Sequence, residues 1–508
     1  MSTDTSPSAS AAVGRALARA PWGTIATIAF VGVALRGLLL WLVLPLDIQS
    51  DEANYLYLAL AKERLGIYYD QHRYFWPPGY PWLLSKSIHA FGIEGLNVLR
   101  AFQVALSSVI GVTTMLFAWR LFSRRAAIVA GVIWAVDLPL GAYTHFLWTE
   151  TVFLSLLLPA LWHFVRALDL ADEGDDLGAT RRLLLSGVLF GVALYIKEYV
   201  LFLVPVFAAV VALRSRGAGW QEALRRASLP VLAVAVVTLP WTLRNHEVYG
   251  RTVVGGATLG ENVFVGLNAR SMNFDVLPLR KRRADLGLPQ IETLARTSFT
   301  EVPAGWVPED RDGNGEIEVR DAGWDREFDA IHAIDRHSSQ LRAGLAFAAE
   351  HPAWTLRTRL KKWSELVTPL SFFTRHQAMA MYPEGGVVAG ALRGPLVFLA
   401  LAVSTLTMLL GAAGYFLTLR RGPCRAVFTV LIGYVVLTSL LVAMSRFRVP
   451  LEPVLIVMTA GLLAHGPQDR SRSRVVGLAV TLLVLTGLWW ISWPETVAAA
   501  QMALGVTR

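Results

Sequence analysis

Eleven predominantly apolar stretches, most of them close to the length that crosses a membrane, constrain this 508-residue chain more than any other feature. About 20 apolar residues in a helix cross the hydrocarbon core of a bilayer, where backbone polar groups must be paired internally. Charged residues make up 17% of the chain against about 25% in ordinary soluble domains. We therefore expect an all-α polytopic membrane protein of about eleven transmembrane helices. The spans are predicted near 22–44, 96–119, 126–143, 149–167, 183–196, 199–213, 228–243, 389–418, 426–444, 449–464 and 475–493.

Two of these spans are short, and the basic residues are distributed unevenly among the loops. The fifth and sixth spans nearly meet at Lys197 and Glu198, which predicts a tight helical hairpin. Lys and Arg accumulate in cytoplasmic loops of membrane proteins. With residue 1 in the cytoplasm, the cytoplasmic loops collect groups such as Arg124 with Arg125, whereas the short outside turns hold little more than Lys197, Arg446 and Arg448. This bias predicts a cytoplasmic N-terminus and an outside C-terminus, and it explains the net charge of +9 without nucleic acid.

The same topology divides the chain into segments. A tail, 1–20, is expected to be disordered, and the first span is expected to be a retained signal anchor rather than a cleaved signal peptide. A single cysteine excludes an internal disulfide. The segments follow in order: an N-terminal transmembrane module, 21–243, containing a first outside loop, 46–95; an outside loop domain, 244–388; C-terminal helices, 389–493; and an outside tail, 494–508.

The first outside loop opens with a pair of acids. Asp51 and Glu52 are followed by the apolar residues of the sequence YLYLAL. The segment is therefore predicted to form an amphipathic helix at the membrane surface. Neighbouring helix residues point about 100° apart, so one of the two carboxylates can face a given cavity. The alternative is that both acids serve as helix-terminus residues favoured by the helix dipole.

An aromatic, proline-rich stretch follows, with the sequence YFWPPGYPW. Pro77, Pro78 and Pro81 with Gly79 predict an extended rigid turn, and Tyr80 lies within it. A loop that folds back onto the membrane with interfacial aromatic residues would have the same composition.

In their order along the chain, these motifs resemble those of a known superfamily. The DE pair and PPGYP are followed by Thr149-Glu150 at the fourth span, PWTLRN at 240–245, GENVFVGLN at 260–268 and SRFRVPLEP at 445–453. The series is similar to that of the GT-C glycosyltransferases of the protein O-mannosyltransferase and aminoarabinose transferase superfamily, over roughly residues 30–460. Relatives usually have a different residue after the basic one at Lys197-Glu198. The resemblance implies the GT-C architecture and transfer of a sugar, a hexose or a pentose, from a polyprenyl-phosphate carrier outside the cytoplasm.

Transfer from a lipid phosphate needs a base for the acceptor hydroxyl and fixed cations for the leaving phosphate. By the resemblance, Asp51 is the expected catalytic base, and Glu52 is a second choice or a substrate contact. The expected phosphate-binding cations are Lys197, Arg244, Arg446 and Arg448, each of which could instead snorkel to the interface.

Further ionisable and aromatic residues complete the predicted site. Glu150 lies at the start of a span and is expected at the acceptor side or behind the catalytic groups, together with Tyr80. Asp137 precedes a proline and is expected to bond freed backbone amides instead. His145 beside Glu150 is too weak a pattern for a metal site.

The large outside loop contains PEDRDGNGEIEVRDAGW, which fits a calcium-binding loop at eight positions. The expected ligands of a structural Ca²⁺ are Asp310, Asp312, Asn314, Glu316 and Asp321. An acidic turn would have a similar composition, and Asp321 replaces the usual glutamate. A nucleotide-sugar site at the DRD sequence is rejected because no βαβ pattern accompanies it, so no nucleotide cofactor is expected. Residues 324–366 predict two amphipathic helices divided near His351 and Pro352.

These features together predict a glycosyltransferase of a bacterial inner membrane that uses a polyprenyl-phosphate sugar. Its acceptor would be a lipid, a glycan or a protein outside the cytoplasm. A transporter, flippase or ligase for lipid-linked saccharides is the alternative. Transporters tend to show internal repeats, and the polar segments here are concentrated asymmetrically in two outside loops.

Overall fold

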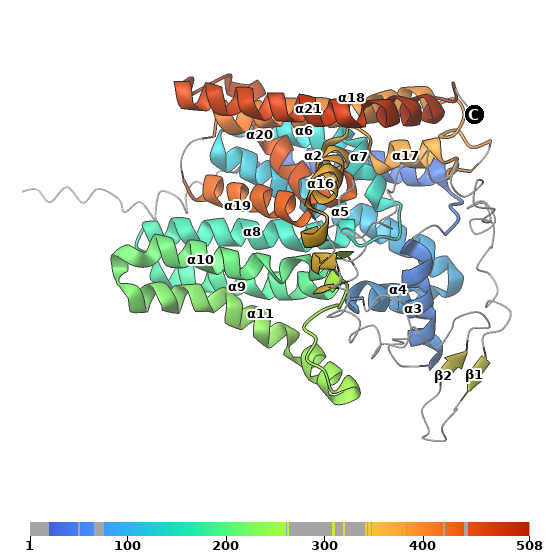
Figure 1. Ribbon diagram of the computed structural model, residues 1–508, viewed down its shortest axis with the longest axis horizontal. Coiled ribbons are helices and arrows are strands. Elements are labelled where there is room, and N and C mark those ends of the chain that lie inside the picture. The colour runs from blue at the N-terminus through green and yellow to red at the C-terminus, as the bar shows by residue number, and fades with distance from the viewer. Residues whose placement is uncertain are drawn as a thin grey trace, which may run out of the picture.

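The computed structural model describes most of the chain and is helical almost throughout (Figure 1). The described residues are 20–48, 51–65, 76–260, 262–263, 307–309, 318–320, 341–342, 344–346, 348–383, 385–419, 422–440 and 445–506. The predicted tail lies almost entirely outside them, as do Asp310, Asp312, Asn314, Glu316 and Asp321. Two short strands, β1 (Val307–Glu309) and β2 (Glu318–Arg320), pair antiparallel; β1 ends directly before the predicted calcium loop, 310–321, and β2 lies within the last part of that loop.

The membrane-spanning helices confirm the polytopic helical class. Nine helical stretches in the described residues are long and apolar enough to cross a membrane, and a bent pair makes a tenth. The shorter apolar helix α19 (Pro423–Thr438) matches the remaining predicted span. The nine stretches are built on α2 (Trp22–Val43), α5 (Gly95–Leu121), α8 (Glu150–Asp172), α9 (Asp176–Ile196), α10 (Leu203–Ser215), α11 (Trp220–Tyr249), α18 (Arg393–Leu417), α20 (Glu452–His465) and α21 (Arg472–Ala503), of which α10 and α20 reach spanning length together with adjoining 3₁₀ turns.

Helix α8 lies at the centre of the bundle and α21 at its margin. In the most apolar 18-residue stretch of each helix, 83% of the residues are buried in α8 and 6% are buried in α21. α8 packs against α5 and α9, and α18 packs against α20. The exposed apolar side chains of α21 fit a helix that faces lipid.

The predicted hairpin at Lys197 differs from the structure in its packing. α9 does end at Ile196, and the 3₁₀ turn η3 (Glu198–Val200) leads directly into α10. However, α9 packs chiefly against α8 and α11, and α10 packs against α11 and α19. The rings of Phe190 and Phe207 stack between α9 and α10 with centroids 5.8 Å apart. α9 and α10 bury more apolar surface against these flanking helices than they would bury against each other.

The bent span consists of α6 (Arg124–Val136) and α7 (Leu138–Gly141) with the turn that follows, at an angle of 58°. Asp137 stands at the break, and its carboxylate accepts a hydrogen bond from the backbone N–H of Leu140 at 2.8 Å. The structure thus supports the expectation that Asp137 bonds a freed backbone amide. Proline removes a backbone donor and disrupts a continuing helix, which explains the bend.

The loop predicted between the first two spans is largely helical. α3 (Asp51–Leu65) begins at the acidic pair, as expected. The turn expected at 77–81 is shorter than predicted, because α4 (Gly79–Phe91) begins at Gly79 and includes Tyr80 and Pro81 in its first turn. A proline in the first turn of a helix costs little, since its missing N–H would be unpaired there anyway.

Two further helices lie at the same end of the molecule as α3 and α4. α16 (Pro352–Val367) starts at the predicted division after His351, and α17 (Phe372–Ala378) is buried along its whole length. Both pack against α21, and α16 also contacts the 3₁₀ helix η6 (Ser445–Leu451) that carries Arg446.

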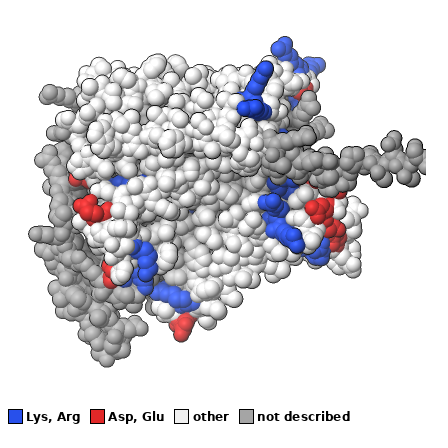
Figure 2. Space-filling view, turned by 180° about the vertical axis from the view of Figure 1, so that it is seen from behind, with Lys and Arg blue, Asp and Glu red and all other residues white. Residues whose placement is uncertain are grey.

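Charged residues collect at the two ends of the bundle. Figure 2 shows a broad uncharged surface between two groups of charged side chains. At one end, Arg120 Nε donates to Asp169 at 3.0 Å, and Arg226 pairs with Asp176 at 2.5 Å. The helix rise of 1.5 Å per residue places Glu150, at the other end of α8, roughly 28 Å from Asp169. The bundle therefore has an arginine-rich end and an opposite end that carries α3, α4 and α17.

Candidate active site

Asp51 and Glu52 point to different partners, as expected for neighbours on a helix. The carboxylate of Asp51 forms an ion pair with Arg446, and its side chain keeps 29% of its exposure. Glu52 is buried, and its carboxylate accepts a hydrogen bond from the backbone N–H of Leu147 at 2.6 Å. Asp51 therefore faces the cationic group, while Glu52 ties the start of α3 to the loop before α8.

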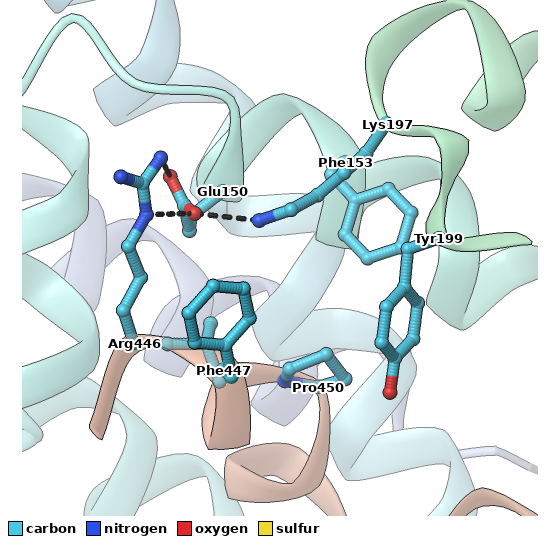
Figure 3. Close-up of a pocket in the computed structure, with 8 residues that line it drawn as sticks. Glu150, Phe153, Lys197, Tyr199, Arg446, Phe447 and Pro450 are labelled. Carbon is cyan, nitrogen blue, oxygen red and sulfur yellow. Dashed lines mark hydrogen bonds and ion pairs between the residues drawn. The ribbon is translucent and has the colours of Figure 1, made fainter. Parts of the chain in front are cut away.

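Glu150 stands at the centre of the charged cluster. Its carboxylate accepts two hydrogen bonds from Arg446, from Nε at 2.5 Å and from Nη2 at 3.2 Å. Lys197 Nζ donates to the same carboxylate at 2.7 Å. Arg446 and Lys197 approach Glu150 from opposite sides (Figure 3). The two-point contact uses the planar fork of arginine, which fixes the guanidinium orientation as well as its position.

Four chain segments distant in sequence supply this group. Asp51 comes from α3, Glu150 from the first residue of α8, Lys197 from the end of α9 and Arg446 from η6. We call Asp51, Glu150, Lys197 and Arg446 the ion cluster. With two acids and two bases, the formal charge of the ion cluster is zero. Each cation is held in place by a carboxylate and could also bind an anionic ligand.

Aromatic rings border the cluster on two sides. The guanidinium of Arg446 lies 4.3 Å from the ring centroid of Trp148, and Lys197 Nζ lies 5.8 Å from that of Phe153. A cation over an aromatic face is stabilised by the ring quadrupole, more so when water is excluded. Partial burial lowers the pKa of Lys197, and the nearby Glu150 carboxylate opposes that shift.

A small pocket opens beside the cluster. Its polar part is formed by the charged side chains already described, and its wall is apolar and aromatic. It is lined by Glu150, Phe153, Lys197, Tyr199, Arg446, Phe447, Val449 and Pro450. Charged groups at one end and apolar side chains along the wall suit a ligand with an anionic head and an apolar tail.

Tyr80 supports the site from behind. It is fully buried, its hydroxyl donates to Gln103 at 2.8 Å, and its ring contacts that of Tyr55 at 5.1 Å. Gln103 donates in turn to the carbonyl oxygens of Thr144 and Phe146, at 3.1 and 2.8 Å. Tyr80 thus holds the loop that leads to Trp148 and Glu150.

The remaining two predicted cations have other partners. Arg448 is buried, and it donates to Glu452 at 2.6 Å, to the carbonyl of Leu366 at 3.1 Å and to that of Thr368. Arg244 donates to Tyr249 at 2.9 Å on its own helix. The structure therefore brings together Lys197 and Arg446 of the four predicted phosphate-binding residues, and these contacts of Arg448 and Arg244 lie outside that group.

Sequence reasoning missed the aromatic residues around the cluster, above all Trp148. The available signal was HFLW at 145–148, an aromatic run directly before a span that begins with an acid. Trp148 and Phe146 form a buried aromatic group with His376 of α17, whose ring centroid lies 4.4 Å from that of Phe146. Sequence spacing could not have indicated His376, since it lies more than two hundred residues away.

A metal site is not formed by the described residues. No group of three or more His, Cys, Asp or Glu side chains among them is placed to hold a metal ion. His145, considered with Glu150 as a weak metal pair, instead has its Nε2 within 3.0 Å of the Tyr382 hydroxyl.

One part of the chain matches a known family. Residues 76–243 match the family described as dolichyl-phosphate-mannose-protein mannosyltransferase. The match covers about one third of the chain and includes Tyr80, Glu150 and Lys197, so the resemblance inferred from the motifs is confirmed over that stretch. No curated protein matches the sequence.

Two solved structures illustrate the range of structural likeness. The chain is similar to the oligosaccharyltransferase AglB from Archaeoglobus fulgidus, in complex with an inhibitory peptide and a dolichol-phosphate, with a TM-score of 0.48 and 15% identity. That alignment covers 95% of this chain and 56% of the archaeal one, so the chain spans just over half the length of AglB. It is also similar to ArnT from Cupriavidus metallidurans bound to undecaprenyl phosphate, with a TM-score of 0.36, 17% identity and coverage of 88% and 78%. Both TM-scores lie below 0.5, so neither likeness by itself defines a substrate.

Proposed function

We propose that this chain is a membrane glycosyltransferase of GT-C type that transfers a sugar from a polyprenyl-phosphate donor to an acceptor outside the cytoplasm. The ion cluster supports the proposal most strongly, because it combines an accessible carboxylate with two fixed cations at the end of the bundle opposite the arginines. The match of residues 76–243 to a mannosyltransferase family supports the same reaction class.

Asp51 is the proposed general base. Of the two acids bound to Arg446, Asp51 keeps 29% of its side-chain exposure, whereas Glu150 keeps 1%. In the reaction, the acceptor hydroxyl oxygen bonds to the anomeric carbon and gives its proton to Asp51. The bond between that carbon and the phosphate oxygen breaks, and the electron pair leaves with the lipid phosphate. A positioned carboxylate contributes typically 10²–10⁴-fold to such a proton transfer.

Arg446 and Lys197 are the proposed partners of the leaving phosphate. Negative charge grows on the phosphate as the glycosidic bond breaks, and cations already in position stabilise it without reorganisation. Glu150 holds both cations in place through its two oxygens. The apolar wall of the pocket, including Phe447 and Val449, would then contact the first isoprenoid units of the donor.

The test of this function is turnover of a purified polyprenyl-phosphate monosaccharide in detergent. Asp51→Asn should lower kcat at least a hundredfold while donor binding persists, since the amide keeps the shape but cannot take up the proton. Asp172→Asn, at the arginine-rich end of α8, is the matched control and should behave as wild type. Full activity of Asp51→Asn would remove the base assignment.

The same assay distinguishes the other functions of such an architecture. A flippase would move the donor between leaflets without consuming it, and a ligase would need a whole lipid-linked glycan. Release of free polyprenyl phosphate from the monosaccharide donor would separate the transferase from both.

The compartment and the calcium loop are further proposals. The arginine-rich end is assigned to the cytoplasm and the ion cluster to the outer face of a bacterial inner membrane, following the distribution of basic residues. Asp310, Asp312, Asn314, Glu316 and Asp321 are proposed to bind a structural Ca²⁺. A rise in the thermal unfolding temperature on adding calcium, absent in Asp312→Ala, would support that site, and equal responses would contradict it.

A further inference from the structure

The segment after α11 folds back against the end of α9. We call residues 251–260 the strap. Asn245 Nδ2 donates to the carbonyl of Val253 at 3.0 Å, and Trp241 Nε1 donates to that of Gly255 at 2.9 Å. A Cβ at Gly255 would lie 2.9 Å from Leu194 Cδ2, so the backbone of the strap packs closely on α9. The strap is therefore seated on the helix that carries Lys197 at its end.

Glu198 binds the strap directly. Its carboxylate accepts hydrogen bonds from the hydroxyl of Thr258 and from the Thr258 backbone N–H, the latter at 3.4 Å. The carbonyl of Thr258 accepts from Asn262 N at 2.9 Å, so Thr258 starts a short helical turn. Because Glu198 is the neighbour of Lys197 in the chain, this contact connects the strap to the ion cluster through a single peptide unit.

Two other contacts hold the same turn. The backbone N–H of Lys197 donates to the carbonyl of Ala193 at 2.9 Å and closes α9. On the other side, the hydroxyl of Tyr434 in α19 donates to the carbonyl of Tyr199. The backbone at Lys197 is thus held by its own helix, by α19 and by the strap, while its side chain reaches Glu150.

We propose that Glu198 is a positioning residue whose bond to Thr258 holds Lys197 in the ion cluster. The ammonium of Lys197 is carried on a flexible four-carbon side chain and bonds Glu150; a fixed backbone lowers the conformational entropy that this bond must overcome. The consequence for the donor rests on the proposed function, in which Lys197 binds the leaving phosphate. The strap would then contribute to the affinity for donor through Glu198.

The first experiment measures the position of Lys197 without any substrate. The full-length protein in detergent is treated with an amine-acetylating reagent, and the rate at Lys197 is followed by mass spectrometry. Thr258→Val and Glu198→Ala should each raise this rate about tenfold, the scale expected when a hydrogen bond to a charged group is lost. Glu198→Gln keeps one acceptor oxygen in place of the two that receive the Thr258 hydroxyl and backbone N–H, so its rate should lie between those of wild type and Glu198→Ala.

Thr242→Val is the matched control, because the Thr242 hydroxyl bonds the carbonyl of Thr238 within α11 at 3.0 Å. It should leave the acetylation rate unchanged. Equal rates in wild type, Thr258→Val and Glu198→Ala would overturn the positioning role of Glu198.

The second experiment measures turnover with a polyprenyl-phosphate monosaccharide. Thr258→Val should raise KM for the donor several-fold with a smaller change in kcat and none in KM for the acceptor. Faster acetylation with an unchanged donor KM would overturn the link to the donor. A wild-type protein that does not turn over the donor would contradict the proposed function, while the acetylation rates would still decide the role of Glu198.

Discussion

Arg446 receives its orientation from two carboxylates and one indole ring. Glu150, which is 1% exposed, depends on Arg446 and Lys197 for its charge to be tolerated. Breaking a buried ion pair typically costs about 3–5 kcal/mol, whereas replacing both partners with apolar residues is often neutral. Arg446→Met should therefore lower the thermal unfolding temperature in detergent, and Arg446→Met combined with Glu150→Leu should recover part of the loss, since Lys197 and Asp51 still lose these partners.

Neither variant should transfer sugar, because both lack the guanidinium that we propose binds the leaving phosphate. Stability and activity are thus separated within one pair of proteins. An Arg446→Met protein as stable as wild type would show that Glu150 does not need this partner.

His376 provides a pH-dependent signal from the same end of the molecule. Burial lowers the pKa of His376 to about 3, and the charges of Arg375 and Arg446 act in the same direction. An unfolded histidine titrates near 6.5, so between about pH 6.5 and 3 the unfolded chain takes up a proton that the folded chain excludes. The contribution of His376 to the free energy of unfolding is therefore fully present above pH 6.5. It decreases on acidification, by up to about 1.4 kcal/mol per pH unit. His376→Phe should flatten the decline in unfolding temperature between pH 6.5 and 4; an unchanged slope would contradict the burial effect.

At the scale of elements, α4 and α9 approach each other through Gly79. A Cβ at this position would lie 2.6 Å from the backbone oxygen of Tyr195, which cannot move aside as a side chain can. Gly79→Ala should therefore force α4 away from the end of α9, cost about 1–3 kcal/mol of stability and reduce turnover, because Lys197 follows two residues after Tyr195. Gly23→Ala in α2 is the control, since nothing lies within 4 Å of its Cβ. Equal unfolding temperatures for the two variants would rule out the close contact.

The prediction of elements from sequence succeeded where a single physical effect outweighs the others. Burial of apolar stretches in lipid identified the spans, and the acidic pair marked the start of α3. Side-chain direction was harder to predict. Arg446 and Arg448 lie two residues apart on a 3₁₀ helix of three residues per turn, so their side chains point about 120° apart and only one can face Glu150. The packing of α16 and α18, which determines that Arg448 binds Leu366, Thr368 and Glu452, is not encoded in local spacing.

At the scale of the whole molecule, the two ends of the bundle differ in how their charges are arranged. At the arginine-rich end, surface pairs such as Arg214 with Asp172 join helix ends, and such exposed pairs contribute about 0–1 kcal/mol each. At the other end, the ion cluster is formed by residues of α3, α8, η6 and the end of α9, and it is bordered by the rings of Trp148 and Phe153, the second of which is drawn in Figure 3. The first arrangement suits orientation in the membrane, and the second suits binding of an anion away from bulk water.

The orientation itself can be tested because the chain has a single cysteine, Cys424, which is buried. Glu94 is exposed between α4 and α5 at the site end, and Gly217 is exposed between α10 and α11 at the arginine-rich end. With the arginine-rich end in the cytoplasm, Glu94→Cys should react with a membrane-impermeant maleimide in intact cells. Gly217→Cys should react after the membrane is permeabilised, and the unsubstituted protein should remain unlabelled under both conditions.

The reversed pattern would place the ion cluster on the cytoplasmic side. In that orientation the positive-inside bias would be violated at loop after loop, and the acceptor would have to be a cytoplasmic molecule. Labelling of both variants in intact cells would instead indicate that one of the two turns does not lie at a membrane surface as the bundle requires. α5 runs from Gly95 to Leu121 and so separates Glu94 from Arg120 by roughly 40 Å. Arg120 lies at the arginine-rich end, as does Gly217, so a reagent on one side of an intact bilayer cannot reach both turns.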